Sequence, residues 1–184
     1  AVNCNGNGNG VITHATNVTA SPGNEVLKAW KHLSLASMIS AGIQTINTAN
    51  AGELTIGTEA PSSKKTGAGF FISTGGTNNG GTGAVTQFST ATNAVFIGKP
   101  LTAAALMTPA LTPEEAFSID QKLDDGLVNS GTFSGANTGV VRANDGEGIT
   151  AASATACTTA AVGPNYNITA TNTAAACVAG LALN

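Results

Sequence analysis

The sequence predicts a single domain of the α+β class. Two segments carry apolar residues at the spacing of helices that bury one face, and short apolar runs of strand length lie between turns rich in Gly, Thr and Asn. The 184 residues fit one domain, and neither a linker nor a repeat of fixed period divides them. We therefore expect helices and strands to pack in layers around a shared core.

The chain is expected to form five consecutive parts within one domain spanning residues 1–184. These are a loop over 1–23, a helix over 24–42, strands and loops over 43–111, a helix over 112–126, and a strand with a C-terminal disulfide region over 127–184.

The first predicted helix has an apolar face and recognisable end signals. Asn24 or Ser21 can cap its N-terminus, and Gly42 is placed to end it. Glu25 suits the positive end of the helix dipole. The apolar side chains recur at helical spacing, and they are Val26, Leu27, Trp30, Leu33, Leu35, Met38 and Ile39.

Short segments between and after the helices have the length and composition of strands. The four that follow the first helix are Leu54–Gly57, Gly69–Ser73, Val85–Ser89 and Ala94–Gly98. Another candidate strand, Gly139–Ala143, follows the second helix. The remaining C-terminal residues are small, and we expect them to form coil.

The second predicted helix has the clearest boundaries in the sequence. Thr112 as N-cap and Glu115 three residues later form a capping box, with Pro113 at the first helical position. Phe117, Ile119 and Leu123 supply the apolar face. Gly126 supplies a left-handed residue beyond the helix end.

Composition and charge exclude several classes of function. Ala, Thr, Gly and Asn fill more than half of the chain, only 9% of the residues are charged, and the net charge is −3. Such a surface cannot hold nucleic acid by general electrostatic attraction. No apolar run in the sequence approaches the roughly 18 residues that span a bilayer.

The cysteines predict one disulfide. Cys157 and Cys177 lie 20 residues apart in a tail with few large apolar residues, and a bridge would remove roughly 3 kcal/mol of loop entropy from the unfolded chain. Such a bridge belongs to an oxidising compartment. Two buried free thiols are the alternative. Cys4 is left over, either as a free thiol or with a partner upstream of Ala1.

The sequence gives weak support to an enzyme. His14 and His32 lie far apart in different contexts, and the common nucleophile, phosphate-loop and zinc-ligand motifs are missing from the sequence. We expect His32, which shares the first helix with Trp30, to pack or to make a capping hydrogen bond. We therefore predict no catalytic site and no firm cofactor.

Acidic residues at the end of the second helix are unfavourable beside the negative end of the helix dipole. Asp124 and Asp125 therefore need partners, which can be backbone N–H groups of the following turn, a basic side chain or a bound cation. The structural interpretation is that they anchor the turn. Calcium is the alternative, because hard cations bind clustered oxygen ligands, and the weak candidate ligands are Asp120, Asp124, Asp125, Asp145 and Glu147.

Two segments taken together resemble bacterial type IV pilin-like proteins and the pseudopilins of type II secretion. Ala29–Ala36, after an Asn-Gly-rich loop, is similar to a segment that follows the N-terminal helix of this family. Ile119–Gly126 resembles its Ile-Asp-x-Lys-x-Asp-Asp-Gly stretch, and Gly139–Arg142 resembles the strand after it. A cysteine pair near the C-terminus is also similar. The residues for which this resemblance implies structural roles are Trp30, His32, Asp124, Asp125 and Gly126.

The resemblance implies a fold and a non-catalytic function. The fold is a helix packed on an antiparallel sheet, with a disulfide-closed C-terminal loop region. The long apolar N-terminal helix of the family is missing from this sequence, so we expect an outward headgroup. Its partners are other subunits of a helical filament, with membrane contact only through the missing helix. Its location is extracellular or periplasmic, after anchoring in the inner membrane before assembly.

Two other classes of function stay open. One is a minor pilin or adhesin at a filament tip that binds DNA or glycan, for which Lys64 and Lys65 are the best local feature. The other is an unrelated extracellular β-rich structural protein. The low charge favours subunits that pack side by side, because a buried unpaired charge is costly.

Overall fold

In the residues that it describes, a computed structural model of the chain contains two α-helices and a five-stranded antiparallel sheet. The structure describes residues 8–12, 25–40, 42–43, 54–74, 93–101, 104–127, 141–144, 157–159, 165–169 and 174–183. The elements are α1 (Val26–Leu35), β1 (Gly69–Thr74), β2 (Asn93–Leu101), β3 (Ala104–Thr108), α2 (Pro113–Leu123), β4 (Val141–Asn144) and β5 (Val178–Leu183). The predicted α+β class is confirmed.

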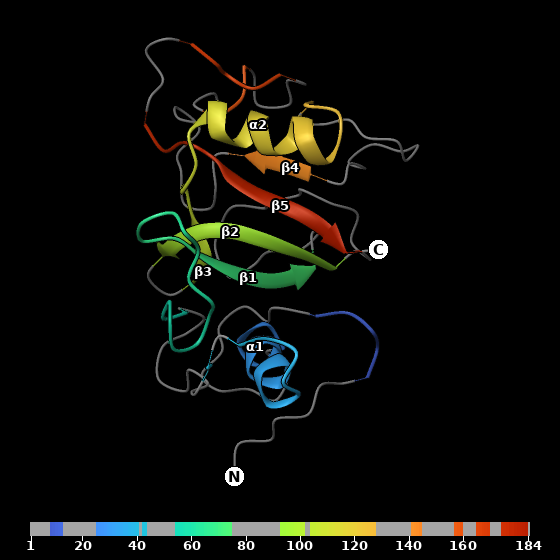
Figure 1. The fold of residues 1–184 in the computed structure, drawn as a ribbon. Helices are drawn as coiled ribbons and strands as arrows, with labels where there is room; N and C mark the ends of the chain where they lie inside the picture. The colour runs from blue at the N-terminus through green and yellow to red at the C-terminus, as the bar shows by residue number, and fades with distance from the viewer. Residues whose placement is uncertain are drawn as a thin grey trace.

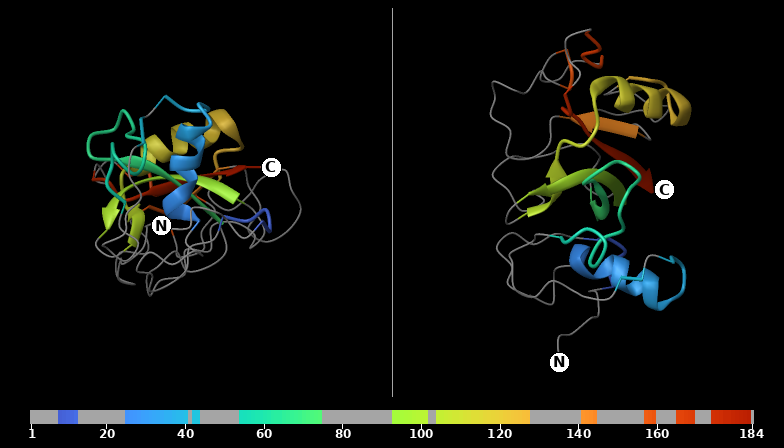
Figure 2. Two further views of the ribbon diagram at one scale, coloured as in Figure 1. Left: turned by 90° about the horizontal axis from the view of Figure 1, so that it is seen from below. Right: turned by 60° about the vertical axis from the view of Figure 1, so that its left-hand side comes forward.

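The sheet joins strands that are far apart in the sequence. Its order is β1-β2-β5-β4, with β3 paired to β2, and every pairing is antiparallel. β5 thus lies between β2 and β4, although it is the last strand of the chain (Figure 1). The two helices flank opposite edges of the sheet, α1 beside β1 and α2 beside β4, and the right-hand view of Figure 2 shows the same order.

The larger core cluster fills the space between α1 and the sheet. Phe71 of β1 and Phe96 of β2 are direct cross-strand partners with no exposed surface, and their rings stack at a centroid distance of 4.7 Å. Such aromatic pairs stabilise a sheet beyond the area they bury. The other buried members are Trp30, Ile43, Leu54, Ala60, Ile72, Ala94 and Val178.

A second core cluster lies under α2. Its buried members are Leu111, Ala116, Cys157, Tyr166, Cys177 and Ala179. Phe117 of α2 packs its ring edge-on against Tyr166, with centroids 5.9 Å apart. This cluster therefore joins α2 to the disulfide-closed C-terminal region.

The predicted helix over 24–42 is too long at its C-terminus. α1 ends at Leu35, and Ser37 takes the left-handed conformation with φ of +58°. Met38 N–H then donates to Leu33 O at 2.9 Å, and Ser37 N–H donates to Ser34 O at 3.0 Å, which is the Schellman pattern of helix ends. The helix therefore stops before Gly42.

The start of α1 also differs from the prediction. The residue at the cap position is Glu25, whose backbone is already helical and whose side chain makes no capping hydrogen bond. The predicted caps Asn24 and Ser21 lie outside the described residues.

Among the predicted strands, Gly69–Ser73 and Ala94–Gly98 are confirmed within β1 and β2. Leu54–Gly57 was wrong as a strand, because Thr55 O accepts the Glu59 N–H at 2.9 Å and folds the chain into a turn. β4 matches the later part of Gly139–Ala143. Val85–Ser89 lies outside the described residues.

The C-terminal prediction of coil was wrong for β5. The strand contains small residues and only two leucines and one valine, so its own sequence gives little strand signal. Pairing with its two neighbouring strands stabilises β5 although its residues have a low intrinsic preference for strands, since β preference depends strongly on context. The prediction also missed β3, which pairs with the C-terminal end of β2.

Candidate functional site

The C-terminal end of α2 carries the most concentrated group of chemically active side chains among the described residues. The start of this helix is fixed by the predicted capping box: Thr112 Oγ1 accepts the Glu115 N–H at 3.2 Å, and Glu115 Oε2 accepts the Thr112 N–H at 2.9 Å. Pro113 occupies the first helical position. The helix start was therefore predictable from sequence.

An ion pair from another part of the chain adds to this helix start. Lys65 donates to Glu115 Oε1 across a sequence separation of 50 residues. The Lys65 hydrogen bond, helped by the Thr112 N–H, holds the pKa of Glu115 below its usual range. Lys65, one member of the basic pair predicted as the best local feature for DNA or glycan binding, is therefore engaged with Glu115, and its neighbour Lys64 is exposed.

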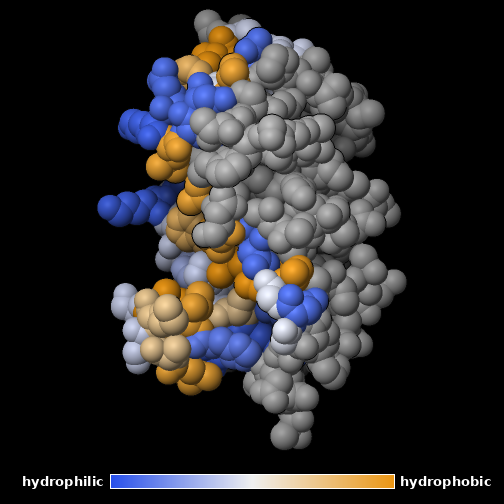
Figure 3. All heavy atoms as spheres, turned by 90° about the vertical axis from the view of Figure 1, so that its right-hand side faces the viewer, coloured by the Kyte–Doolittle hydropathy of each residue, from blue (hydrophilic) through white to orange (hydrophobic). Residues whose placement is uncertain are grey.

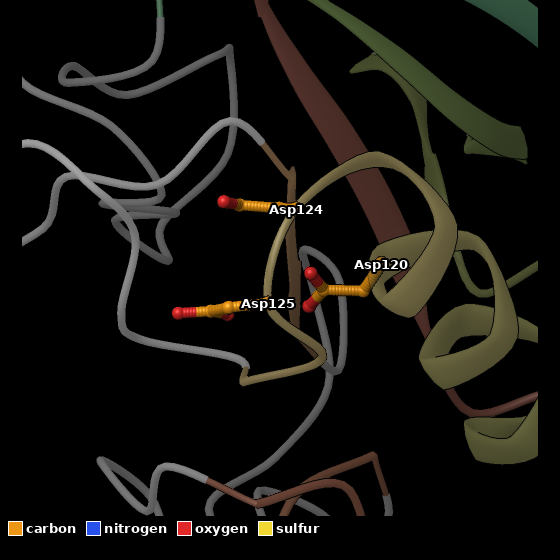
Figure 4. A group of neighbouring side chains, drawn as sticks. All are labelled: Asp120, Asp124 and Asp125. Carbon is orange, nitrogen blue, oxygen red and sulfur yellow. The ribbon is translucent and has the colours of Figure 1, made fainter.

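Three carboxylates meet at the other end of α2, and we call them the acidic cluster: Asp120, Asp124 and Asp125. One ligand oxygen from each lies within 4.8 Å of the others. Figure 4 shows Asp120 reaching from the helix toward the turn, while Asp124 and Asp125 point away from the helix. Asp120 has no exposed surface, Asp124 is half-buried and Asp125 is exposed.

Asp120 is held by hydrogen bonds on both carboxylate oxygens. Oδ1 accepts the Gly126 N–H at 3.2 Å, and Oδ2 accepts the Tyr166 hydroxyl at 2.6 Å. Burial raises the pKa of Asp120 to about 6, and the nearby charges of Asp125 and Asp124 add to this shift against the two hydrogen bonds. The carboxyl therefore changes protonation near pH 6.

The turn after α2 needs glycine at position 126. Gly126 has φ of +76°, and a Cβ there would lie 3.1 Å from Phe117 Cε2. Asp125 Oδ1 accepts the Leu127 N–H at 2.8 Å, which fixes the next residue of the turn. Asp125 therefore has a backbone N–H partner of the predicted kind, and Asp120, for which no partner was predicted, has one as well.

The acidic cluster has the donor set of a site for a hard cation, because such ions bind clustered carboxylate oxygens. Each Asp120 oxygen already accepts one proton donor and retains a further lone pair. The same contacts also suffice to anchor the turn without any ion. The other predicted ligands, Asp145 and Glu147, lie outside the described residues, as do His14 and Cys4.

The disulfide-closed region supplies a residue that the sequence analysis missed. Cys157 and Cys177 form the predicted disulfide, with Cα atoms 5.0 Å apart. Tyr166 pairs with Thr158 in an isolated β-bridge beside Cys157, and its hydroxyl reaches Asp120 46 residues away. The only available signal was that Tyr166 is the sole tyrosine, a residue that needs a hydroxyl partner when buried.

The predicted motif residues of α1 lie far from the acidic cluster, at the opposite edge of the sheet (Figure 1). Trp30 is buried in the larger core, and its Nε1 has no hydrogen-bond partner among the described residues. His32 is exposed in the last turn of the helix, so it does not pack in the core. The structure therefore does not bring His32 and the acids together.

A cleft of about 520 Å³ lies between α1, the N-terminal segment and the ends of three strands. Asn93 shapes it by accepting the Ile12 N–H at 2.8 Å and donating to Gly10 O at 2.9 Å. Its lining is mostly apolar with a few polar groups, and it includes Ile12, Lys28, His32, Leu33, Ile72 and Leu183.

Figure 3 shows one face of the molecule, on which hydrophilic and hydrophobic groups of described residues lie side by side from the α2 end to the α1 end. Comparison of the chain with protein-family models, curated proteins and solved structures found no match. Within the described parts of the chain, neither helix has the length and hydropathy needed to cross a membrane.

Proposed function

We propose that this chain is the globular head of a type IV pilin-like subunit, a pilin or pseudopilin that builds a pilus or a type II secretion pseudopilus. Its role in this proposal is structural, and its partners are further subunits of the same filament. The domain works outside the cytoplasm, where an oxidising environment preserves the Cys157–Cys177 disulfide.

The observation that carries the proposal is the set of contacts made by the segment Ile119–Gly126, which resembles a pilin-like motif. Its Asp120 fastens the end of α2 both to the following turn and to the disulfide-closed region. Asp125 and Gly126 shape that turn. These contacts support an architectural role for the motif, which is what a building block of a filament requires.

Surface composition gives independent support. Only 9% of the residues are charged. Exposed apolar side chains lie at or just after the C-terminal ends of α1 and α2, among them Leu35, Met38 and Leu123. Subunits packed side by side bury such surfaces at a small electrostatic cost, since few charges lose their hydration.

A second candidate is a binding module at a filament tip, which the cleft beside α1 favours. Its volume lies in the range of sites for small organic ligands, and its lining combines apolar walls with Lys28 and His32. For this candidate a glycan is a better ligand than DNA, because the Lys64–Lys65 pair lies outside the cleft and Lys65 is engaged with Glu115.

Deletion of the gene in its native host tests the proposal and separates the two candidates. A main structural subunit predicts loss of surface filaments or of type II secretion, with recovery on complementation by the full-length gene. A tip module predicts filaments that persist but lose glycan binding. Normal filaments, secretion and glycan binding in the deletion strain would contradict both.

The codons upstream of Ala1 give a second, independent test. A pilin-like subunit predicts a short basic leader and then about 20 apolar residues, long enough for a membrane-spanning helix. An unrelated β-rich secreted protein predicts a cleavable signal sequence with no such helix after it. The latter finding would overturn the filament proposal even if the fold stands.

A further inference from the structure

The contacts around α2 form a closed ring that includes the disulfide. Before the helix, Leu111 and Cys177 exchange backbone hydrogen bonds of 3.0 and 2.8 Å. Cys177 is bonded to Cys157, whose carbonyl accepts the Asn167 N–H at 2.9 Å beside Tyr166. The Tyr166 hydroxyl then returns to Asp120 near the helix end. We call this ring the clamp.

Tyr166 is the point where the clamp meets the turn. It is carried by the short segment 165–169, which is fastened to 157–159 by backbone hydrogen bonds at Thr159 and Asn167 and by the Thr158 bridge. Besides the main chain, the disulfide is a further covalent link from this pair of segments to the sheet, and it joins them to Cys177 beside β5. The position of the Tyr166 hydroxyl therefore depends in part on that link.

Asp120 connects the Tyr166 hydroxyl to the turn after α2. Its buried carboxylate shares its two oxygens between Tyr166 and the Gly126 N–H, so both partners fix one side chain. A buried carboxylate that loses a donor is strongly disfavoured and either takes up a proton or returns to water. In either case the bond to Gly126 weakens, and the turn 124–127 loses one of its two anchors, the other being the Asp125–Leu127 hydrogen bond.

We propose that the disulfide sets the conformation of the turn 124–127 through Tyr166, so that thiol–disulfide exchange at Cys157 and Cys177 opens this turn while the sheet stays folded. Tyr166 is a positioning residue in this device. The inference does not depend on the filament proposal, because it concerns contacts within one chain. The larger core cluster, which packs α1 against the sheet, does not contain the disulfide. The packing of β1 and β2 around that cluster therefore does not depend on the disulfide.

The exchange step balances with a dithiol as reductant. Cys157 and Cys177 are both buried, so the attack requires a local opening that exposes one sulfur. A thiolate of the dithiol then attacks that sulfur, the protein disulfide breaks with release of the other sulfur as a thiolate, and a mixed disulfide forms. The second thiol of the reductant attacks the mixed disulfide and releases the remaining protein sulfur. Two electrons and two protons pass to the protein, which gains two thiols, while the reductant becomes a cyclic disulfide. The carboxylate of Asp120 takes no part in this chemistry.

Amide hydrogen exchange in the full chain, measured by NMR with and without dithiothreitol, tests the device. Reduction is expected to speed exchange of the Gly126 amide by roughly tenfold or more, because that amide loses a buried acceptor. The Phe96 amide in β2 serves as the internal control and should keep its protection. Near-UV dichroism of the sole tyrosine should change in parallel.

The variant Tyr166→Phe keeps the ring against Phe117 but removes the hydroxyl. In the oxidised protein it should speed Gly126 exchange as reduction does, and reduction of the variant should add little more. The variant Ile168→Ala, at an exposed residue of the same segment, is the matched control and should leave Gly126 unchanged.

Three results would overturn the inference. One is equal loss of protection at Gly126 and Phe96 on reduction, which would make the disulfide a staple of the whole fold. Another is an unchanged Gly126 amide in Tyr166→Phe. The third is full additivity of reduction and Tyr166→Phe, which would show that the disulfide acts on the turn by another route.

Discussion

The two ends of the molecule secure their helices by different means. α2 has a complete capping box, an ion pair at its start and a buried carboxylate held from both sides at its end. α1 has no side-chain cap at Glu25, the first described residue of its start, and it ends at a non-glycine residue in the left-handed conformation. It also buries an indole N–H with no partner among the described residues. The α1 end combines apolar packing with a hydrogen bond from Lys31 Nζ to Ile43 O at 3.0 Å, whereas the polar contacts of the α2 end lie at both helix termini.

This difference shows where the fold tolerates change. Apolar packing is non-directional, and a core accepts other side chains of similar volume. A polar clamp defines one geometry, and loss of a single partner leaves a buried group unsatisfied. We therefore expect the α2 end to present a fixed surface and the α1 end to adapt to what it contacts.

Phe71→Ala should have the largest effect, a loss of roughly 3–5 kcal/mol, because it empties the centre of the apolar cluster. The free energy of unfolding from denaturant titration measures this loss. Phe70→Ala, at the half-buried neighbouring residue, is the matched control and should lose clearly less. Equal losses would show that the Phe71–Phe96 stack does not centre this core.

Asp120→Asn should change how stability depends on pH. The pKa of Asp120 is about 6 in the folded protein against 3.8 for a free side chain, so the folded state binds the proton more tightly. The contribution of this carboxyl to the free energy of unfolding is fully present below its unfolded pKa and is lost as pH rises through 6. The loss is up to about 3 kcal/mol.

Asn cannot ionise, so the variant should gain stability over the wild type as pH rises from 4 to 7. Denaturant titrations at several pH values check this, with Asp124→Asn as the control in the same cluster. Parallel pH curves for Asp120→Asn and the wild type would mean that the buried carboxyl does not titrate in this range.

Thr112→Ala should cost about 1 kcal/mol, because it removes the side-chain half of the capping box. Thr112→Ser keeps the hydroxyl and should recover most of that loss. Thermal unfolding monitored by circular dichroism compares the two variants. A matching loss in both would point to the Thr112 methyl group as the source of the effect.

Ser37→Gly should have the smallest effect and the opposite sign, a gain of roughly 0.5–1 kcal/mol, since glycine adopts the left-handed conformation without strain. Ser34→Gly, inside α1, is the control and should lose a similar amount. Destabilisation by Ser37→Gly would show that the serine side chain makes a contact worth more than the strain it causes.

The sequence predicted the features whose signals are local. The capping box at Thr112, the apolar periodicity of α1 and the strand at Ala94–Gly98 depend on neighbouring residues, and all three are present. The end of α1 was misplaced, because Ser37 is a rare choice for the left-handed position and Gly42 is the common one.

The features that escaped prediction depend on distant contacts. β5 becomes a strand through pairing with β2 and β4, and its small residues carry little strand signal of their own. In the candidate site, the carboxylates were found because they are close in sequence, whereas Tyr166 lies 46 residues from Asp120. Only the folded chain brings these two together.

Immunogold labelling of filaments sheared from cells that produce the full-length protein tests the central claim most directly. Antibodies raised against this domain should label the filaments at regular intervals along their whole length, as expected for an outward-facing subunit head. Filaments that form normally but carry no label anywhere would contradict the account.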